Sequence, residues 1–105
     1  MNIQKMMKQM QKMQKQMLDT QKDLESKEVE VSVGGANVTV RANGAGDVIS
    51  LKIAKEVVDP EDVEILEDLV LSAVKQAIQK GKDLAANEMK KVTEGLPLPP
   101  GMGGF

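Results

Sequence analysis

Residues 28–53 have the sequence EVEVSVGGANVTVRANGAGDVISLKI, and the architecture of the chain follows from this stretch. Apolar and polar residues alternate there in three runs, at 29–33, 38–41 and 49–53. A period of two is typical of strands with one buried face. The intervening GGAN and GAGD segments supply glycines for the positive φ angles of tight turns. The stretch therefore predicts a three-stranded antiparallel meander.

The apolar face of this meander provides the candidate core. Five side chains are assigned either to the core or to a dimer interface: Val38, Val40, Ile49, Leu51 and Ile53. A three-stranded sheet with open edges is a small core for a chain that also carries two long helices. We therefore expect the protein to be a homodimer.

A helix is predicted before the meander, because apolar positions recur there at alternating spacings of three and four residues. These positions are Ile3, Met6, Met10, Met13, Met17, Thr20 and Leu24. The stripe could be a packed seam, a surface that binds another protein's apolar helix, or a face that inserts into an anionic membrane surface. The stripe has no Trp or Phe, which disfavours membrane insertion.

A second long helix is predicted after the meander. The segment Asp59-Pro60-Glu61-Asp62 has the capping, proline and acidic residues of a helix start, so we expect the helix to begin near Pro60. Apolar positions then continue to Val92, and the helix is expected to end at about Glu94. The following LPLPPGMGGF segment predicts a flexible tail over 95–105.

The lengths of these elements predict an elongated molecule. At 1.5 Å per residue the two helices span roughly 36 and 52 Å, whereas a strand of seven residues covers roughly 23 Å. Both helices must overhang the sheet, and their free ends can project the same way as an antiparallel arm. In that arm the Met stripe would lie against Leu84, Met89 and Val92. The predicted fold is α+β, in the order α-β-β-β-α, as a single domain over 1–94.

The composition excludes most catalytic chemistry. The chain has no Cys, no His, no Trp and no Tyr, so zinc sites built on Cys or His and nucleophile–His pairs cannot form. The acids near Pro60 are explained by helix capping, and we expect no metal, no cofactor, no small-molecule substrate and no enzymatic activity. No apolar run approaches the roughly 20 residues of a membrane span, and we expect a cytoplasmic protein.

Charge is segregated along the chain despite a net charge of only −2. Residues 1–18 carry four lysines and no acid, whereas residues 56–68 carry seven acids and no base. Lysines near a helix N-terminus oppose the helix dipole, which costs a few tenths of a kcal/mol per charge. Lysines that oppose the dipole without a visible compensating interaction indicate a binding function.

The motifs NGAGDV, at 43–48, and DPEDVEILEDL, at 59–69, are the most specific parts of a resemblance that covers nearly the whole chain. They closely resemble the nucleoid-associated YbaB/EbfC family of bacterial DNA-binding proteins. The resemblance implies a tweezer-shaped α-β-β-β-α homodimer that binds double-stranded DNA at the nucleoid, with little sequence preference. It assigns binding to the two terminal helices, whose candidate residues are Lys5, Lys8, Lys12, Lys15, Lys80, Lys82, Lys90 and Lys91.

The residue types limit how DNA could be recognised. The one arginine, Arg41, lies in a predicted strand, and the one aromatic residue is Phe105. Base-specific contacts and base stacking therefore lack their usual side chains. Lysines that contact phosphates remain, and such contacts position a protein without specifying a sequence. We expect an architectural or regulatory DNA-binding protein; the alternative is an interaction module that recruits a protein partner through its Met-rich helix.

Overall fold

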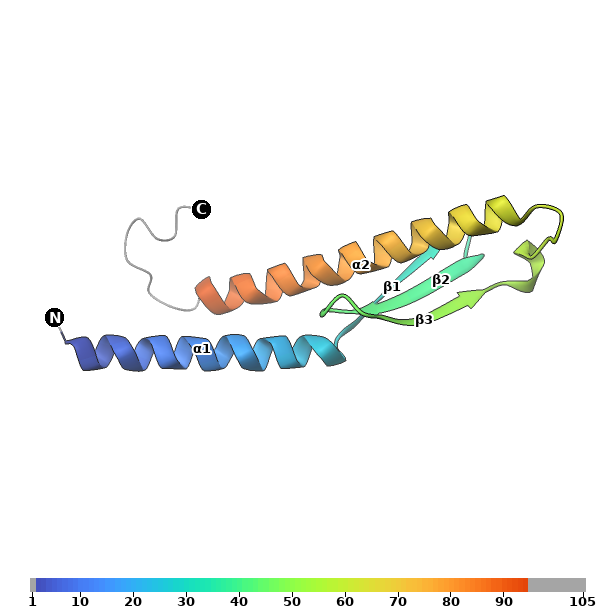
Figure 1. The fold of residues 1–105 in the computed structure, drawn as a ribbon. Coiled ribbons are helices and arrows are strands. Elements are labelled where there is room, and N and C mark those ends of the chain that lie inside the picture. The colour runs from blue at the N-terminus through green and yellow to red at the C-terminus, as the bar shows by residue number, and fades with distance from the viewer. Residues whose placement is uncertain (1, 95–105) are drawn as a thin grey trace.

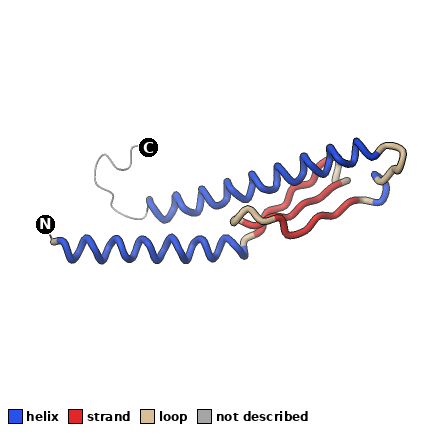
Figure 2. Tube along the Cα trace, in the orientation of Figure 1, coloured by secondary structure: helices blue, strands red, loops and turns tan. Residues whose placement is uncertain are grey.

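The computed structural model describes residues 2–94. The chain forms a helix, three strands, a short 3-10 helix and a second helix, as Figures 1 and 2 show. The elements are α1 (Ile3–Ser26), β1 (Glu28–Val33), β2 (Val38–Asn43), β3 (Val48–Ile53), η1 (Lys55–Val57) and α2 (Val63–Glu94). The predicted α+β class and element order are confirmed. The tail predicted over 95–105 lies outside the described residues.

The three strands form one antiparallel sheet in the order β1-β2-β3. Val40, at the centre of β2, is opposite Val31 on one side and Leu51 on the other. The register shifts next to Ala42, which pairs with Val48. Positive φ angles at Gly34 and Gly35, and at Gly46, turn the chain between the strands as the sequence predicted.

The core lies between α2 and the central strand. Five residues form its fully buried centre: Val38, Val40 and Ala42 of β2, and Ala73 and Ala77 of α2. Small side chains on the facing turns of α2 let the helix lie close to the sheet. Val29, Val31 and Ile53 are partly buried around this centre.

The third strand is much less covered than the other two. α2 lies over β1 and β2 and leaves β3 to one side, as Figure 1 shows. Leu51 shares the core face with Val40, yet 42% of its surface is exposed, and Ile49 is 46% exposed. Of the five residues assigned to core or interface, Val38 and Val40 therefore belong to the core of the single chain, and Ile53 lies at its edge.

The two helices begin differently. Asn2 caps α1, because its side-chain Oδ1 accepts hydrogen bonds from the backbone N–H groups of Gln4 (3.1 Å) and Lys5 (3.4 Å). The start predicted near Pro60 was wrong, since α2 begins at Val63. The Asp59 carboxylate accepts a hydrogen bond from the backbone N–H of Glu61, and the Asp59 carbonyl accepts one from that of Asp62. These two bonds form a separate turn before the helix.

The helices form the predicted antiparallel arm, and the chain measures 71 × 25 × 16 Å. The free ends of α1 and α2 point the same way in Figure 1. In the second half of α1, Met13 and Met17 are half-buried, as are Leu84, Met89 and Val92 on α2. The first half of α1 runs past the end of α2 and is exposed, so only half of the Met stripe packs as expected.

Candidate nucleic-acid interface

The lysines of α1 form a row on the side of the helix that faces away from α2. Each lies two residues after a stripe position, which places it about 200° around a helix of 3.6 residues per turn. The row consists of Lys5, Lys8, Lys12 and Lys15, and all four are exposed. Within residues 2–94 none of these amino groups is in an ion pair. The row therefore offers four exposed amino groups to a ligand.

The candidate lysines of α2 have different surroundings. Lys80 Nζ donates a hydrogen bond to the Glu30 carbonyl oxygen of β1, 3.0 Å away. Lys91 lies 3.7 Å from the Glu88 carboxylate, which also contacts Lys27 at 3.4 Å. Lys90 is 3.9 Å from Glu94 in an exposed pair. Lys82 is exposed next to the buried Gly81.

The structure thus divides the eight candidates into two groups. Six lie on the arm, four on α1 and the two near the C-terminal end of α2. Lys80 and Lys82 instead lie where α2 crosses the end of the sheet. Carboxylates within 4 Å partly neutralise the α2 pair of the arm, whereas no lysine of the α1 row is in an ion pair within residues 2–94. The row on α1 is therefore the strongest uncompensated positive feature of the candidate interface.

The acidic segment lies at the opposite end of the molecule from this row. Residues 56–68 connect η1 to the first turns of α2, where the acids suit the positive end of the helix dipole. In the described part of the chain, no three acidic side chains come together in a way that could hold a metal ion. Asp59 closes a turn before the helix and does not cap α2, so the predicted capping was wrong there, whereas Glu64 in the first turn keeps the predicted match to the helix dipole.

Asn43 joins the arm to the sheet, a role that sequence reasoning missed. Its side-chain amide donates to the Glu25 carbonyl at the end of α1, at 3.2 Å. Its Oδ1 accepts from the backbone N–H groups of Ala45 (3.0 Å) and Asp47 (2.9 Å) in the next turn. The residue is only 6% exposed. One buried amide thus holds both the turn and the end of α1.

Two glycines allow the helices to approach this point. A Cβ on Gly44 would lie 2.5 Å from Leu24 Cδ2 of α1, and a Cβ on Gly81 of α2 would collide with the Asn43 carbonyl oxygen. The backbone N–H of Gly44 also donates to the Leu24 carbonyl at 2.9 Å. We call Leu24, Asn43, Gly44 and Gly81 the arm junction. The sequence analysis assigned NGAGDV to a turn and Leu24 to the apolar stripe, and neither assignment indicated the contact with Gly81.

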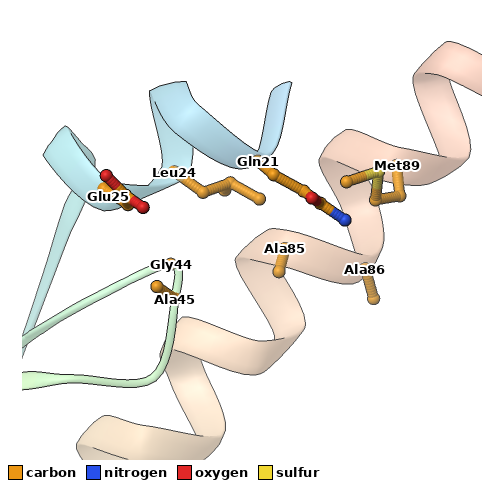
Figure 3. Close-up of a pocket in the computed structure, with 8 residues that line it drawn as sticks. All are labelled: Gln21, Leu24, Glu25, Gly44, Ala45, Ala85, Ala86 and Met89. Atoms are coloured by element: carbon orange, nitrogen blue, oxygen red, sulfur yellow. The ribbon is translucent and has the colours of Figure 1, made fainter. Parts of the chain in front are cut away.

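A shallow groove of about 480 Å³ opens beside the arm junction, between α1, the β2–β3 turn and α2 (Figure 3). Its lining is mostly small or apolar: Gln21, Leu24, Glu25, Gly44, Ala45, Ala85, Ala86 and Met89. Glu25 is the single ionisable residue among them. This lining offers no acid–base pair for catalysis.

The far face of the sheet is polar and internally paired. Arg41 forms an ion pair with Glu28 of the neighbouring strand, and the Ser32 and Thr39 hydroxyl groups are hydrogen-bonded at 2.9 Å. The guanidinium group is therefore engaged within the sheet, away from the lysine row. Because the one arginine is paired in the sheet, it is not available for the bidentate contact with guanine in a DNA groove.

The architecture, a three-stranded sheet with a protruding helical arm, defines a class of small α+β proteins. A model of the YbaB/EbfC DNA-binding family matches residues 1–96, and the chain belongs to this family. The resemblance drawn from the sequence is thereby confirmed. The family is one of DNA-binding proteins, not of enzymes. No helix within residues 2–94 is long and apolar enough to cross a membrane.

Relatives with curated names are similar over nearly their whole length. A nucleoid-associated protein of a Geobacillus species is 58% identical over 98 residues, covering 93% of this chain and 91% of the relative. A nucleoid-associated protein of Clostridium novyi is 52% identical over 99 residues, covering 94% and 87%. The crystal structure of an uncharacterized protein from Helicobacter pylori has the same fold, with a TM-score of 0.76, 19% identity, and coverage of 89% and 98%.

Proposed function

We propose that the protein binds double-stranded DNA as a homodimer, mainly through contacts between lysine side chains and backbone phosphates, as a nucleoid-associated architectural protein. The lysine row on α1 carries this proposal. Four exposed amino groups lie on one side of a helix that has no acid in its first turn. Their spacing along one face suits a run of phosphates, and the relatives are named as nucleoid-associated proteins.

The recognition we propose depends on shape and charge more than on base sequence. Lysines act on phosphates as point charges and carry no sequence information. The one arginine is paired within the sheet. Lys80 is held by the Glu30 carbonyl, so we assign it a smaller part than the row on α1.

The salt dependence of binding tests this mechanism. If about four to six phosphates are neutralised, the logarithm of the association constant should fall against the logarithm of salt concentration with a slope of about −4 to −5. Fluorescence anisotropy on a random-sequence duplex over a salt series measures the slope. A slope near zero, or a preference above about a thousandfold for one sequence, contradicts binding through the backbone.

The proposed dimer interface is the uncovered apolar face of β3. This strand lies at the edge of the sheet and exposes Val48, Ile49 and Leu51. An unpaired edge beside an apolar face is a favourable surface for a second copy to cover. The dimer would then carry two arms, so that one DNA duplex is held at two places.

Replacing Leu51 with Asp should break the dimer without unfolding the chain, because this side chain is 42% exposed in the single chain. Val40→Asp should instead unfold it, since Val40 is completely buried and the new carboxylate would have no partner. Sedimentation and circular dichroism measure the two outcomes. Ser50→Asp, on the polar face of the same strand, is the matched control and should stay dimeric. A dimeric Leu51→Asp variant would place the interface elsewhere.

The alternative function, recruitment of a protein partner through the Met-rich helix, is favoured by one observation. The first half of the α1 stripe is exposed. Charge reversal on the opposite lysine face would leave that recruitment intact and abolish DNA binding. A variant with Lys5, Lys8 and Lys12 replaced by Glu therefore separates the two functions.

A further inference from the structure

The free end of α1 carries an apolar stripe that has no cover among residues 2–94. Ile3 is 71% exposed and Met10 is 64% exposed, and Met6 and Met7 beside them are also exposed. The same stripe is half-buried further along the helix, at Met13 and Met17. Figures 1 and 2 show α1 continuing past the end of α2. The exposed stripe is thus the direct continuation of an existing helix–helix interface.

The flanks of this stripe carry no charge. In heptad terms, Ile3 and Met10 occupy position a, and Met6 and Met13 occupy position d. The neighbouring e and g positions hold only Met and Gln: Met7, Gln9, Gln14 and Gln16. Charges at e and g normally decide which helices pair with which. Two copies of this segment can therefore meet stripe to stripe without facing like charges.

The lysines do not oppose such pairing, because they occupy positions c and f on the other side of the helix. Lys5 and Lys12 are at c, and Lys8 and Lys15 are at f. A helix paired through its stripe would still present this row outward. The arrangement lets one surface hold DNA while the opposite surface holds another protein molecule.

We propose that the segment Ile3–Met13 of α1 is a docking surface for the same segment of a second copy, and that it links protein dimers that are bound to DNA. The proposal rests on the DNA binding proposed above and adds a protein–protein contact to it. The occupant is a second copy, because the stripe continues an α-helical seam of this chain and its neutral flanks are self-compatible.

The contact should be weak in free solution. The segment is about 16 Å long, and so short a helix–helix contact gains little on its own. DNA raises the local concentration of bound dimers, which converts pairing into a nearly intramolecular event. We therefore expect cooperative binding on long DNA and independent binding on a duplex that holds one dimer.

Cross-linking tests the contact directly, because the chain contains no Cys. Met10→Cys places a thiol in the stripe, and Gln11→Cys places one at position b, off the stripe. With a short bismaleimide and long DNA, we expect covalent dimers from Met10→Cys and few from Gln11→Cys. The yield should rise with protein concentration. Equal yields from both variants, or a yield independent of concentration, overturn the proposal, since the second result would locate the contact within one dimer.

Binding curves give a second, independent test. The double variant Met6→Gln/Met10→Gln keeps every lysine and should bind a short duplex with unchanged affinity. On long DNA its Hill coefficient should fall to about one, whereas Gln4→Ala/Gln11→Ala should remain as cooperative as the parent. Cooperativity that survives in the stripe variant overturns the docking surface. If the parent protein does not bind the short duplex, the DNA-binding proposal itself is overturned.

Discussion

Replacing Lys5, Lys8 and Lys12 with Glu should lower the affinity for a random-sequence duplex by about a thousandfold or more at physiological salt. Each neutralised phosphate contributes about 0.7 log units of affinity at 0.15 M salt. If these lysines make about four of the proposed contacts, their loss removes about three log units, and the new carboxylates add repulsion. The chain should remain folded, because acids near a helix N-terminus favour the dipole and Asn2 still caps α1.

A gel-shift assay and circular dichroism on the same preparation measure these outcomes. A matched pair of double variants provides the control. Lys5→Glu/Lys8→Glu changes the arm, and Lys55→Glu/Lys75→Glu changes exposed sites away from the arm. Both change the net charge equally. Only the arm variant should lose most of its affinity. Equal losses would indicate that net charge alone controls binding, and parental affinity in the folded triple variant would remove α1 from the interface.

Gly81→Ala should destabilise the protein, although the same change inside an ordinary helix stabilises it by about 1 kcal/mol. The added Cβ would collide with the Asn43 carbonyl oxygen, which is backbone and cannot rotate away. Forcing α2 away from the sheet destabilises the fold by overpacking. We expect this cost to exceed the gain in helix propensity by about 1–3 kcal/mol. We expect the midpoint of thermal unfolding to fall by roughly 5–15 °C.

Thermal unfolding at equal protein concentration measures this change, since the stability of the proposed dimer depends on concentration. Asn87→Ala is the control, because Asn87 is exposed on the same helix and its replacement should stabilise by about half a kcal/mol. A Gly81→Ala variant more stable than the parent would show that α2 can shift at the arm junction without strain. The arm's position would then be adjustable and not set by close packing.

The sheet and the arm were predictable because they depend on local periodicity. Strands at 28–33, 38–43 and 48–53 follow from alternation and from glycines at the turns. The burial of Val38 and Val40 follows from the same alternation. The helix lengths then required an overhang, since the helices are longer than any strand. Predicting these features requires only the local sequence pattern and the known rise per residue of helices and strands.

Other features depend on residues distant in sequence and could not be predicted in this way. Gly81 is needed because a carbonyl at Asn43, 38 positions earlier, lies against it. Pro60 suggested a helix start, but Asp59 closes a separate turn and delays α2 to Val63. Leu51 has the same pattern as Val40, and only the placement of α2 leaves it exposed. The ion pair between Lys27 and Glu88 was likewise not predictable, whereas the pairs of Lys90 and Lys91 follow ordinary helical spacing.

The separation of charge along the 71 Å axis affects how fast the protein finds DNA as well as how tightly it holds it. A molecule with acids at one end and lysines at the other has a large electric dipole moment. In the field of a polyanion such a molecule turns its lysine end forward before contact, which raises the bimolecular association rate and suppresses wrongly oriented encounters. At constant net charge, a smaller separation between the acids and the lysines should therefore slow association at low salt, even where the exchanged residues touch no phosphate.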